Sequence, residues 1–205
     1  MARSTPGPLT ILDVGGRPQY WEMMTADLSI PQEFAITLLN VEVQSATQPG
    51  FTCLVGDGRA MPQFAEKQFD IVYSNSTIEH VSSFADQQRM ASEIRRVGRR
   101  YCIQTPNRFF PIEPHFLFPF FQFLPLELRI WLLQHFNLGW YGRQPKRQDA
   151  VSEVTEIRLL TRTEMITLFP EAIIYEEKYL GLVKSFVAYS TFTGKPLNFR
   201  AKADV

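Results

Sequence analysis

Short apolar runs alternate with amphipathic segments along the first half of the chain. Five runs, at residues 9–14, 36–39, 51–55, 69–73 and 100–104, are almost continuous in apolar and β-branched side chains. Such runs are typical of strands covered on both faces, as in a parallel sheet. Strands that alternate with helices predict an α/β sheet, in which the helices connect parallel strands through right-handed crossovers.

The clearest helix lies between the fourth and fifth runs. Met90 and Ile94 recur at the spacing of one buried helix face. Ser82 or Ser83 would cap the start of this helix, since a serine side chain can accept a hydrogen bond from a free backbone N–H there. Gly98 would end it, directly after a last turn that carries two arginines.

The C-terminal part predicts one more helix and two strands. Thr161 or Thr163 would cap the helix. The strands are expected near residues 173–177 and 183–191, separated by Gly181. A glycine turn between two apolar runs indicates an antiparallel pair.

The composition supports one packed domain spanning residues 1–205. The chain is 45% hydrophobic and 20% charged, which predicts a core rather than disorder. Lys plus Arg and Asp plus Glu number 21 each. No overall positive field therefore favours a nucleic-acid partner.

Several features bear on the location of the protein. The first ten residues contain no apolar segment of the kind that a signal peptide needs. The longest uncharged stretch of the Phe-rich region, at 116–126, contains prolines and falls far below the ~20 residues of a membrane span. Cys53 and Cys102 are too few for a disulfide scaffold or a zinc site. We therefore predict a cytoplasmic protein with two core thiols and no membrane span.

Candidate ligand-binding residues follow the first four predicted strands, at 13–18, 40–42, 56–62 and 74–80. In open α/β sheets, ligands bind outside the carboxyl ends of the strands. The glycines after the first strand would let the backbone approach a ligand closely. Polar or acidic side chains after the second strand can accept hydrogen bonds from ribose hydroxyls, and a carboxylate after the third can accept one from an exocyclic amine.

Taken in order, these motifs resemble the type 11 group of S-adenosylmethionine-dependent methyltransferases. The resemblance rests on Asp13-Val-Gly-Gly16, on Gly56-Asp-Gly-Arg-Ala-Met-Pro62 and on Phe69-Asp-Ile-Val-Tyr-Ser-Asn-Ser-Thr-Ile-Glu-His-Val81. It covers about residues 9–107 well and continues more loosely to the last strand pair. Each motif alone is weak, but together they occupy consecutive strand ends.

The resemblance implies a Rossmann-like three-layer α/β/α sandwich with a mostly parallel seven-stranded sheet. The implied strand order is 3-2-1-4-5-7-6, with the last strand antiparallel. In that order Cys53 and Cys102 lie four strand spacings apart, about 19 Å, which is too far for a disulfide.

The resemblance also implies which residues hold S-adenosylmethionine. The first loop would hold the methionine end of the cofactor, Asp57 the adenine amine, and Ser74 the far side of the methionine moiety. The ribose contact stays open between Asn40 and Glu42, because the usual acid at the end of the second strand is Asn40 here. A second departure is Arg17-Pro18 in place of the third glycine of the first loop. The predicted cofactor residues are Asp13, Gly15, Gly16, Asn40, Glu42, Asp57, Gly58 and Ser74.

Other nucleotide chemistries lack their motifs. The chain has no Gly-x-Gly-x-x-Gly after the first strand and no Walker-type Gly-x-x-x-x-Gly-Lys. It has no His-Glu-x-x-His and no Cys-x-x-Cys, so we predict no metal site. The fourth strand is followed by Ser74-Asn75-Ser76-Thr77 and not by the Asp/Asn-Pro-Pro-Tyr typical of nucleic-acid amino methyltransferases.

An aromatic-rich insertion is predicted at about residues 105–147. Eleven of the 27 aromatic residues lie between Phe109 and Tyr141, and prolines interrupt regular helix there. Phe side chains carry no polar group, so a wall of them selects for apolar area. The insertion would be a lid over an apolar acceptor, a plain packing layer on the sheet, or a surface that contacts a membrane. The basic residues Arg143, Lys146 and Arg147 fit a solvated loop, an anionic acceptor or lipid head groups.

The sequence thus favours an enzyme that transfers a methyl group from S-adenosylmethionine to a small, partly hydrophobic acceptor. Methyl transfer is an in-line displacement in which the protein aligns the acceptor and excludes water. An oxygen or nitrogen acceptor benefits from a base, and His80 or His115 is the candidate. Two alternatives remain: a cofactor-binding module without catalysis, and a membrane-surface interaction protein that uses the aromatic segment.

Overall fold

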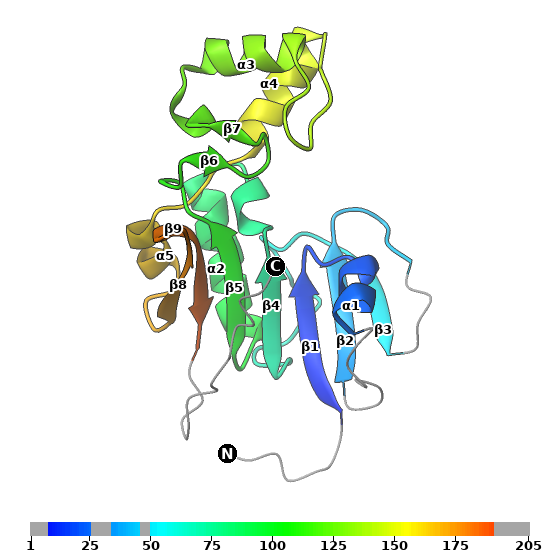
Figure 1. Cartoon of the computed structure of the whole chain (residues 1–205). Coiled ribbons are helices and arrows are strands. Elements are labelled where there is room, and N and C mark those ends of the chain that lie inside the picture. Colours follow the sequence, from blue (N-terminus) through cyan, green and yellow to red (C-terminus); the bar gives the residue numbers. More distant parts are fainter. Residues whose placement is uncertain (1–7, 26–33, 46–49, 191–205) are drawn as a thin grey trace.

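A computed structural model describes residues 8–25, 34–45 and 50–190, and the strands within these ranges build one main sheet (Figure 1). Seven strands form it in the order β3-β2-β1-β4-β5-β9-β8. Their bounds are β1 Leu9–Val14, β2 Phe34–Asn40, β3 Phe51–Val55, β4 Ile71–Asn75, β5 Tyr101–Pro106, β8 Ile173–Tyr179 and β9 Leu182–Tyr189. The first five are mutually parallel, and β9 runs antiparallel to both β5 and β8.

This topology confirms the predicted sheet. Two further strands, β6 (Ile112–Glu113) and β7 (Phe118–Pro119), form a separate small hairpin, and they shift the strand labels. Counted along the main sheet alone, the order is 3-2-1-4-5-7-6. Cys53 on β3 and Cys102 on β5 are both free, with three strands between them.

Helices cover both faces of the sheet. Helices α2 (Phe84–Val97) and α5 (Arg162–Leu168) pack on the larger core, which contains Leu12 and Val72. Helix α1 (Pro18–Thr25) packs through Trp21 on the opposite face, where Ile11 and Ile36 are buried. Neighbouring residues of β1 thus point to opposite layers, as the period of two in a strand requires. The three-layer α/β/α arrangement predicted from the sequence is confirmed.

The local signals at the helix ends are borne out as well. The Ser83 side chain accepts a hydrogen bond from the Asp86 N–H at the start of α2, and Gly98 follows its last residue. Thr161 and Glu164 form a reciprocal capping box at the start of α5. Only the strands predicted at 9–14 and 51–55 have the predicted bounds, and the others differ by one or two residues at one or both ends. In the strand predicted at 69–73 the reason is that Phe69 pairs only with Gly98, outside the ladder of β4. Residue 191 of the predicted last strand lies outside the described residues.

A second, smaller body, the lobe (residues 107–158), stands above the carboxyl ends of β4 and β5 (Figure 1). It contains the β6–β7 hairpin, the short helix η2 (Phe121–Phe123) and helices α3 (Leu126–His135) and α4 (Arg147–Glu156). Its buried cluster is distinct from the core of the sheet: Phe116, Phe121, Ile130, Leu133, Leu138, Ala150 and Val154. Helices α3 and α4 were not predicted from the sequence, and α4 continues past residue 147.

The two ends of the lobe lie side by side. The Arg108 N–H donates to the Leu160 carbonyl at 2.9 Å, and Asn107 forms a bridge with Leu160. The lobe is therefore an insertion between β5 and α5 that leaves and re-enters the sheet at one point. Within the described residues, no helix is long and apolar enough to cross a membrane.

Candidate functional site

The loop between β1 and α1 depends on its two glycines. Gly15 has φ +82°, a conformation that disfavours side chains, and a Cβ atom at this position would lie 2.3 Å from Thr77. A Cβ atom at Gly16 would lie 2.1 Å from the Asp13 carboxylate. Helix α1 begins at Pro18, whose fixed φ suits a first helical position. Arg17-Pro18, which replaces the usual third glycine of the loop, therefore lies where the chain enters α1.

Asp13 lies beneath this loop and is 2% exposed. Its Oδ2 accepts a hydrogen bond from the Trp21 Nε1–H at 2.6 Å. Burial raises the pKa of the Asp13 carboxyl to about 7, although the Trp21 hydrogen bond opposes this shift. A buried carboxyl close to its titration point is well placed to be stabilised in its charged form by a nearby cation.

The two candidates for the ribose contact occupy different positions. The Asn40 amide donates weakly to the Gly16 carbonyl at 3.4 Å, and its Oδ1 accepts from the Glu42 N–H at 3.2 Å. Asn40 is therefore used to shape the strand-end turn beside the glycine loop. The Glu42 side chain is exposed, and its carboxylate is the more open acceptor of the two.

Asp57 follows β3 and is partly committed to a neighbour. Both its carboxylate oxygens accept from the Arg59 Nε–H, at 3.0 and 2.9 Å, and this hydrogen bond holds the Asp57 pKa below its usual value. The Asp57 side chain is still 41% exposed. Gly58 is needed for packing, because a Cβ atom there would lie 2.7 Å from Val14.

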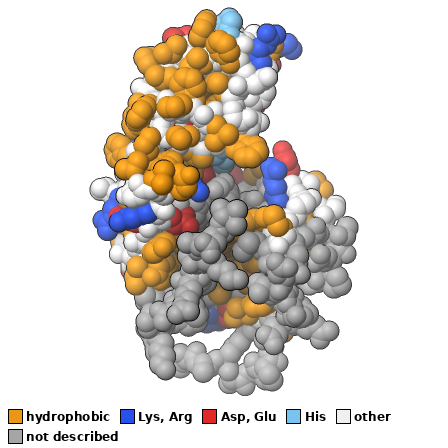
Figure 2. All heavy atoms as spheres, in the orientation of Figure 1, with side chains coloured by type: hydrophobic (Ala, Val, Ile, Leu, Met, Phe, Trp, Pro, Cys, Tyr) orange, Lys and Arg blue, Asp and Glu red, His pale blue; other side chains and the backbone are white. Residues whose placement is uncertain are grey.

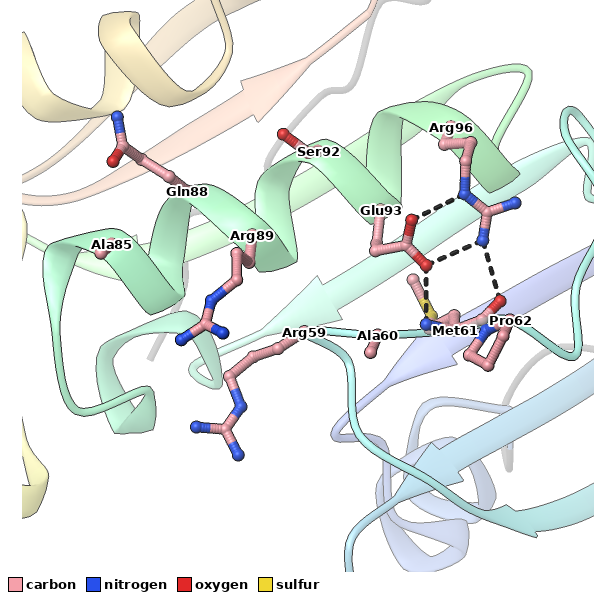
Figure 3. A pocket seen from close by; sticks show the side chains of 10 residues that line it. All are labelled: Arg59, Ala60, Met61, Pro62, Ala85, Gln88, Arg89, Ser92, Glu93 and Arg96. Atoms are coloured by element: carbon pink, nitrogen blue, oxygen red, sulfur yellow. Dashed lines mark hydrogen bonds and ion pairs between the residues drawn. The ribbon is translucent and has the colours of Figure 1, made fainter.

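A pocket of about 670 Å³ lies between the 59–62 segment and α2 (Figure 3). At one end the Glu93 carboxylate accepts from the Met61 N–H at 2.6 Å, while Arg96 donates to the Met61 carbonyl at 2.8 Å. These bonds satisfy backbone groups of an irregular segment and fix it against α2. The hydrogen bonds of Glu93 and Arg96 to Met61 therefore hold the segment that follows Asp57 against α2.

Ser74 is placed differently from the prediction. Its side chain is fully buried and its hydroxyl donates to the Val14 carbonyl at 2.8 Å. This bond joins the end of β4 to the end of β1, directly before the glycine loop. Ser74 thus presents no exposed surface to a ligand and acts on the loop through the backbone.

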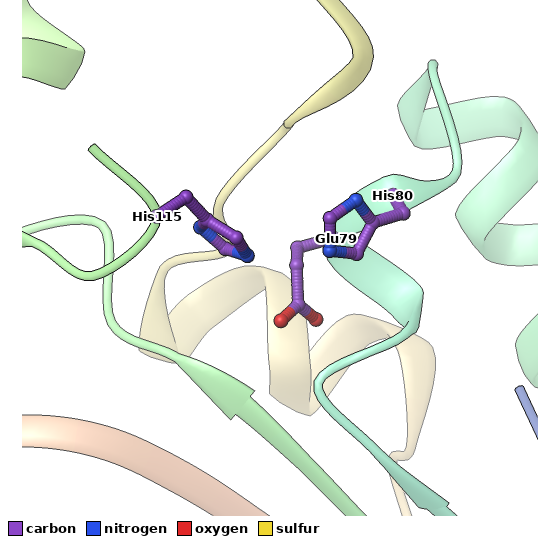
Figure 4. A group of neighbouring side chains, drawn as sticks. All are labelled: Glu79, His80 and His115. Atoms are coloured by element: carbon purple, nitrogen blue, oxygen red, sulfur yellow. The ribbon is translucent and has the colours of Figure 1, made fainter. Parts of the chain in front are cut away.

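The two histidines proposed as alternative bases lie next to each other (Figure 4). His80 ends the short helix η1 (Ile78–His80) after β4, whereas His115 belongs to the lobe. Their ring centroids are 4.9 Å apart at an interplanar angle of 86°. The pair therefore marks the seam between the sheet and the lobe.

Each histidine has its own carboxylate partner. His80 Nδ1 lies 3.3 Å from Glu156 Oε1, and His115 Nδ1 lies 2.7 Å from Glu113 Oε1. Burial and the neighbouring His115 lower the pKa of His80. Burial also opposes the charged form of His115, but the Glu113 carboxylate outweighs it and raises the His115 pKa.

Glu79, which was not among the predicted site residues, lies between the two rings. The side chain is fully buried, and burial raises its pKa to about 7. Glu79 Oε2 accepts from the Thr105 hydroxyl at 2.9 Å, whereas Oε1 has no hydrogen-bond partner among the described residues. An acid directly before a histidine at a strand end was the available signal. Its burial depends on the lobe and could not be read from the sequence.

Comparison with known proteins agrees with this fold and these strand ends. Residues 22–101 match the type 11 family model described as "Methyltransferase domain". An uncharacterised protein of Mycobacterium tuberculosis, found in strains CDC 1551 and H37Rv, is 36% identical over 66 residues. That match covers 32% of this chain and 22% of the length of the mycobacterial protein.

Solved methyltransferases share the fold at low sequence identity. The carbon methyltransferase CurJ has a TM-score of 0.57 at 9% identity, over 92% of this chain and 49% of that one. The citrinin polyketide synthase CMeT domain has a TM-score of 0.55 at 13% identity, over 91% and 47%. A SAM-dependent methyltransferase from Aquifex aeolicus has a TM-score of 0.51 at 10% identity, over 90% and 83%.

The sheet order is that of the class I methyltransferase fold, which the solved methyltransferases share at low sequence identity. Over residues 22–101 the chain is similar to the type 11 methyltransferase family. The resemblance identified in the sequence is thereby confirmed.

Proposed function

We propose that the chain transfers a methyl group from S-adenosylmethionine to a small acceptor with a substantial hydrophobic part. The observation that carries the proposal is the contact of His80, which follows β4 at the carboxyl edge of the sheet, with His115 of the aromatic lobe. In open α/β sheets this edge is where ligands react.

The residues of the first loop fit the cofactor. The side chains of Thr77 and Asp13 pack against Gly15 and Gly16 where a Cβ atom would lie, and this packing fixes the shape of the loop. Asp13 would hold the cationic methionine end, Asp57 the adenine amine, and Asn40 or Glu42 the ribose. When bound, S-adenosylmethionine supplies a methyl group on a sulfonium, a good leaving group. The protein's task is then to align the acceptor, exclude water and accept a proton at His80 or His115.

Aromatic side chains of the lobe support the apolar acceptor. Phe116 and Phe121 are buried in the core of the lobe, but Phe109 is 65% exposed and Phe123 is 47% exposed. These last two rings stack at 6.1 Å between centroids. They are thus not used to fill the core of the sheet and remain available to an acceptor.

The cofactor proposal is tested by calorimetric titration with S-adenosylhomocysteine. Asp57→Ala is expected to weaken binding by about 1–3 kcal/mol, because a charge-assisted hydrogen bond to the adenine amine is lost. Asp149→Ala, which removes an exposed carboxylate on α4, is the matched control and should bind like the parent protein. Equal affinities for both variants would remove Asp57 from the site. Labelled methyl donor with quinone-like, aromatic and lipid-like acceptors then tests turnover, and binding without turnover favours a non-catalytic module.

A second candidate function is contact of the lobe with a membrane surface, which would deliver a lipid-like acceptor. The observation that favours it is the exposed apolar face of the lobe (Figure 2). Among the apolar side chains of the lobe, Trp140 is 82% exposed and Phe120 is 56% exposed. Aromatic side chains anchor well at the lipid interface, and the exposed Arg143 and Lys146 would add attraction to anionic head groups.

Co-sedimentation with anionic phospholipid vesicles tests the membrane contact. Trp140→Ser combined with Phe109→Ser should reduce the bound fraction severalfold, since interfacial binding scales with buried apolar area. Met23→Ser on α1 removes a side chain that is 71% exposed outside the lobe and serves as the matched control. Binding that is equal in all three proteins, or absent in the parent, would exclude the lobe as a membrane anchor.

A further inference from the structure

The seam between sheet and lobe gathers three metal-ligating side chains. One donor atom each from Glu79, His80 and His115 lies within 4.8 Å of the other two (Figure 4). The two imidazole rings stand on either side of the Glu79 side chain. Two of these residues come from the segment after β4, and the third comes from the lobe.

The hydrogen bonds of the two histidines leave one nitrogen of each ring available. The Nδ1 atoms of His80 and His115 face the carboxylates of Glu156 and Glu113. A carboxylate at Nδ1 accepts the Nδ1–H and so fixes the tautomer in which the Nε2 lone pair is free to bind a metal. This is the usual arrangement around metal-bound histidines. The backbone N–H of His115 also donates a hydrogen bond to Glu113 Oε2 at 2.8 Å, which holds the residue further.

An independent observation is the unpaired oxygen of Glu79. Within the part of the chain that the structure describes, this fully buried carboxylate has a hydrogen-bond partner for Oε2 only, and Oε1 has none. A buried acceptor without a partner is costly and calls for an unseen one. The groups next to Glu79 are the imidazoles of His80 and His115, each of which has a carboxylate partner of its own at Nδ1. A cation can therefore bind the Glu79 carboxylate and both imidazoles together.

We propose that Glu79, His80 and His115 bind a divalent transition-metal ion at the seam between sheet and lobe. Two histidines and one carboxylate are the donor set of catalytic zinc sites and of non-haem iron(II) sites, which keep open positions. This reverses the expectation of no metal site, which rested on the absence of contiguous motifs. Donor atoms around such an ion lie about 3–3.5 Å apart, so the three side chains would draw together on binding.

Glu79 and His80 follow β4, at the edge of the sheet where the acceptor is proposed to bind. An oxygen of water or of the acceptor would complete the coordination of the metal, which would lower the pKa of that oxygen in place of a histidine base. This last role rests on the proposed function, whereas metal binding itself does not.

Metal binding is tested on the full chain, purified without a histidine tag and dialysed against a chelator. Titration with Co²⁺ should produce visible d–d absorption that saturates at one ion per chain, and Zn²⁺ should abolish it by displacement. His115→Gln and Glu79→Gln should each weaken binding at least about tenfold, and Glu156→Gln by about 10–100-fold, as for other groups that orient a ligand.

The third histidine of the chain supplies the control. His135 lies on α3 against Trp131, away from the cluster, so His135→Gln should leave the Co²⁺ titration unchanged. Circular dichroism of each variant separates lost binding from lost fold. Absence of the Co²⁺ band in the folded parent, or equal weakening in His135→Gln, overturns the proposal. Titration of the same preparation with S-adenosylhomocysteine distinguishes the two proposals. A protein that binds Co²⁺ but not S-adenosylhomocysteine would support the metal site and overturn the methyltransferase proposal.

Discussion

Gly15→Ala is expected to destabilise the protein by about 2–5 kcal/mol and to abolish measurable cofactor binding. Two costs combine at this position. The backbone at φ +82° disfavours a side chain by about 1–2 kcal/mol. In addition, the new Cβ atom would lie 2.3 Å from Thr77, and displacing a packed side chain costs about 1–3 kcal/mol more. Because the loop itself must shift, its backbone groups no longer meet a ligand.

Two other glycines separate these costs. Gly181→Ala introduces a side chain at φ +81° with no described atom within 4 Å, so it should cost only about 1–2 kcal/mol. Gly142→Ala has free space and no positive φ, and it should be close to neutral. Chemical denaturation of the three variants gives the free energies of unfolding. A Gly15→Ala protein as stable as the Gly181→Ala protein would show that the contact with Thr77 is not tight.

Asp13→Asn is expected to stabilise the folded protein above pH 7 while weakening cofactor binding. The Asp13 pKa is raised by burial from 3.8 to about 7, so ionisation is unfavourable in the folded state. The stability associated with this carboxyl is therefore complete below pH 4 and is lost as the pH rises to 7. The loss amounts to at most about 4 kcal/mol, given 1.36 kcal/mol per pKa unit. Asparagine can still accept the Trp21 hydrogen bond but does not ionise.

Denaturation of parent and variant between pH 4 and pH 8 measures this effect. The two stability curves should meet near pH 4 and diverge by about 1–4 kcal/mol by pH 8, with the variant above. Glu79 titrates in a similar range but is present in both proteins, so the difference reports Asp13 alone. Parallel curves would mean that Asp13 keeps its ordinary pKa. Equal S-adenosylhomocysteine affinities would mean that its charge does not serve the cofactor.

The strand-end residues show how far sequence reasoning reached into the candidate site. Asp13 and the glycines after it were recognisable because a parallel strand places the next residues at the ligand-binding edge of the sheet. Ser74 obeyed the same rule but is buried against Val14. The rule locates a residue along the strand, whereas contact between two strand ends decides where its side chain points.

The histidine pair illustrates the opposite case. His80 and His115 are 35 positions apart in the chain, and the sequence offered them only as alternatives. Their contact arises because the lobe leaves and re-enters the sheet at Asn107 and Leu160. The turn at Gly139 then holds the segment of His115, whose carbonyl accepts from the Trp140 N–H at 3.0 Å.

Local signals in the sequence predicted the strands, their alternation with helices, and the caps of α2 and α5, because these features depend on periodicity and turn chemistry. The three-layer arrangement, the strand order and the loop that would hold the cofactor were implied by the resemblance of the strand-end motifs to type 11 methyltransferases. Only the tertiary structure decided the helices of the lobe and the burial of Glu79 between two histidines. The physical reason is that burial and side-chain proximity depend on how an insertion folds back on the sheet, and this packing has no periodic signature in the residues that take part in it.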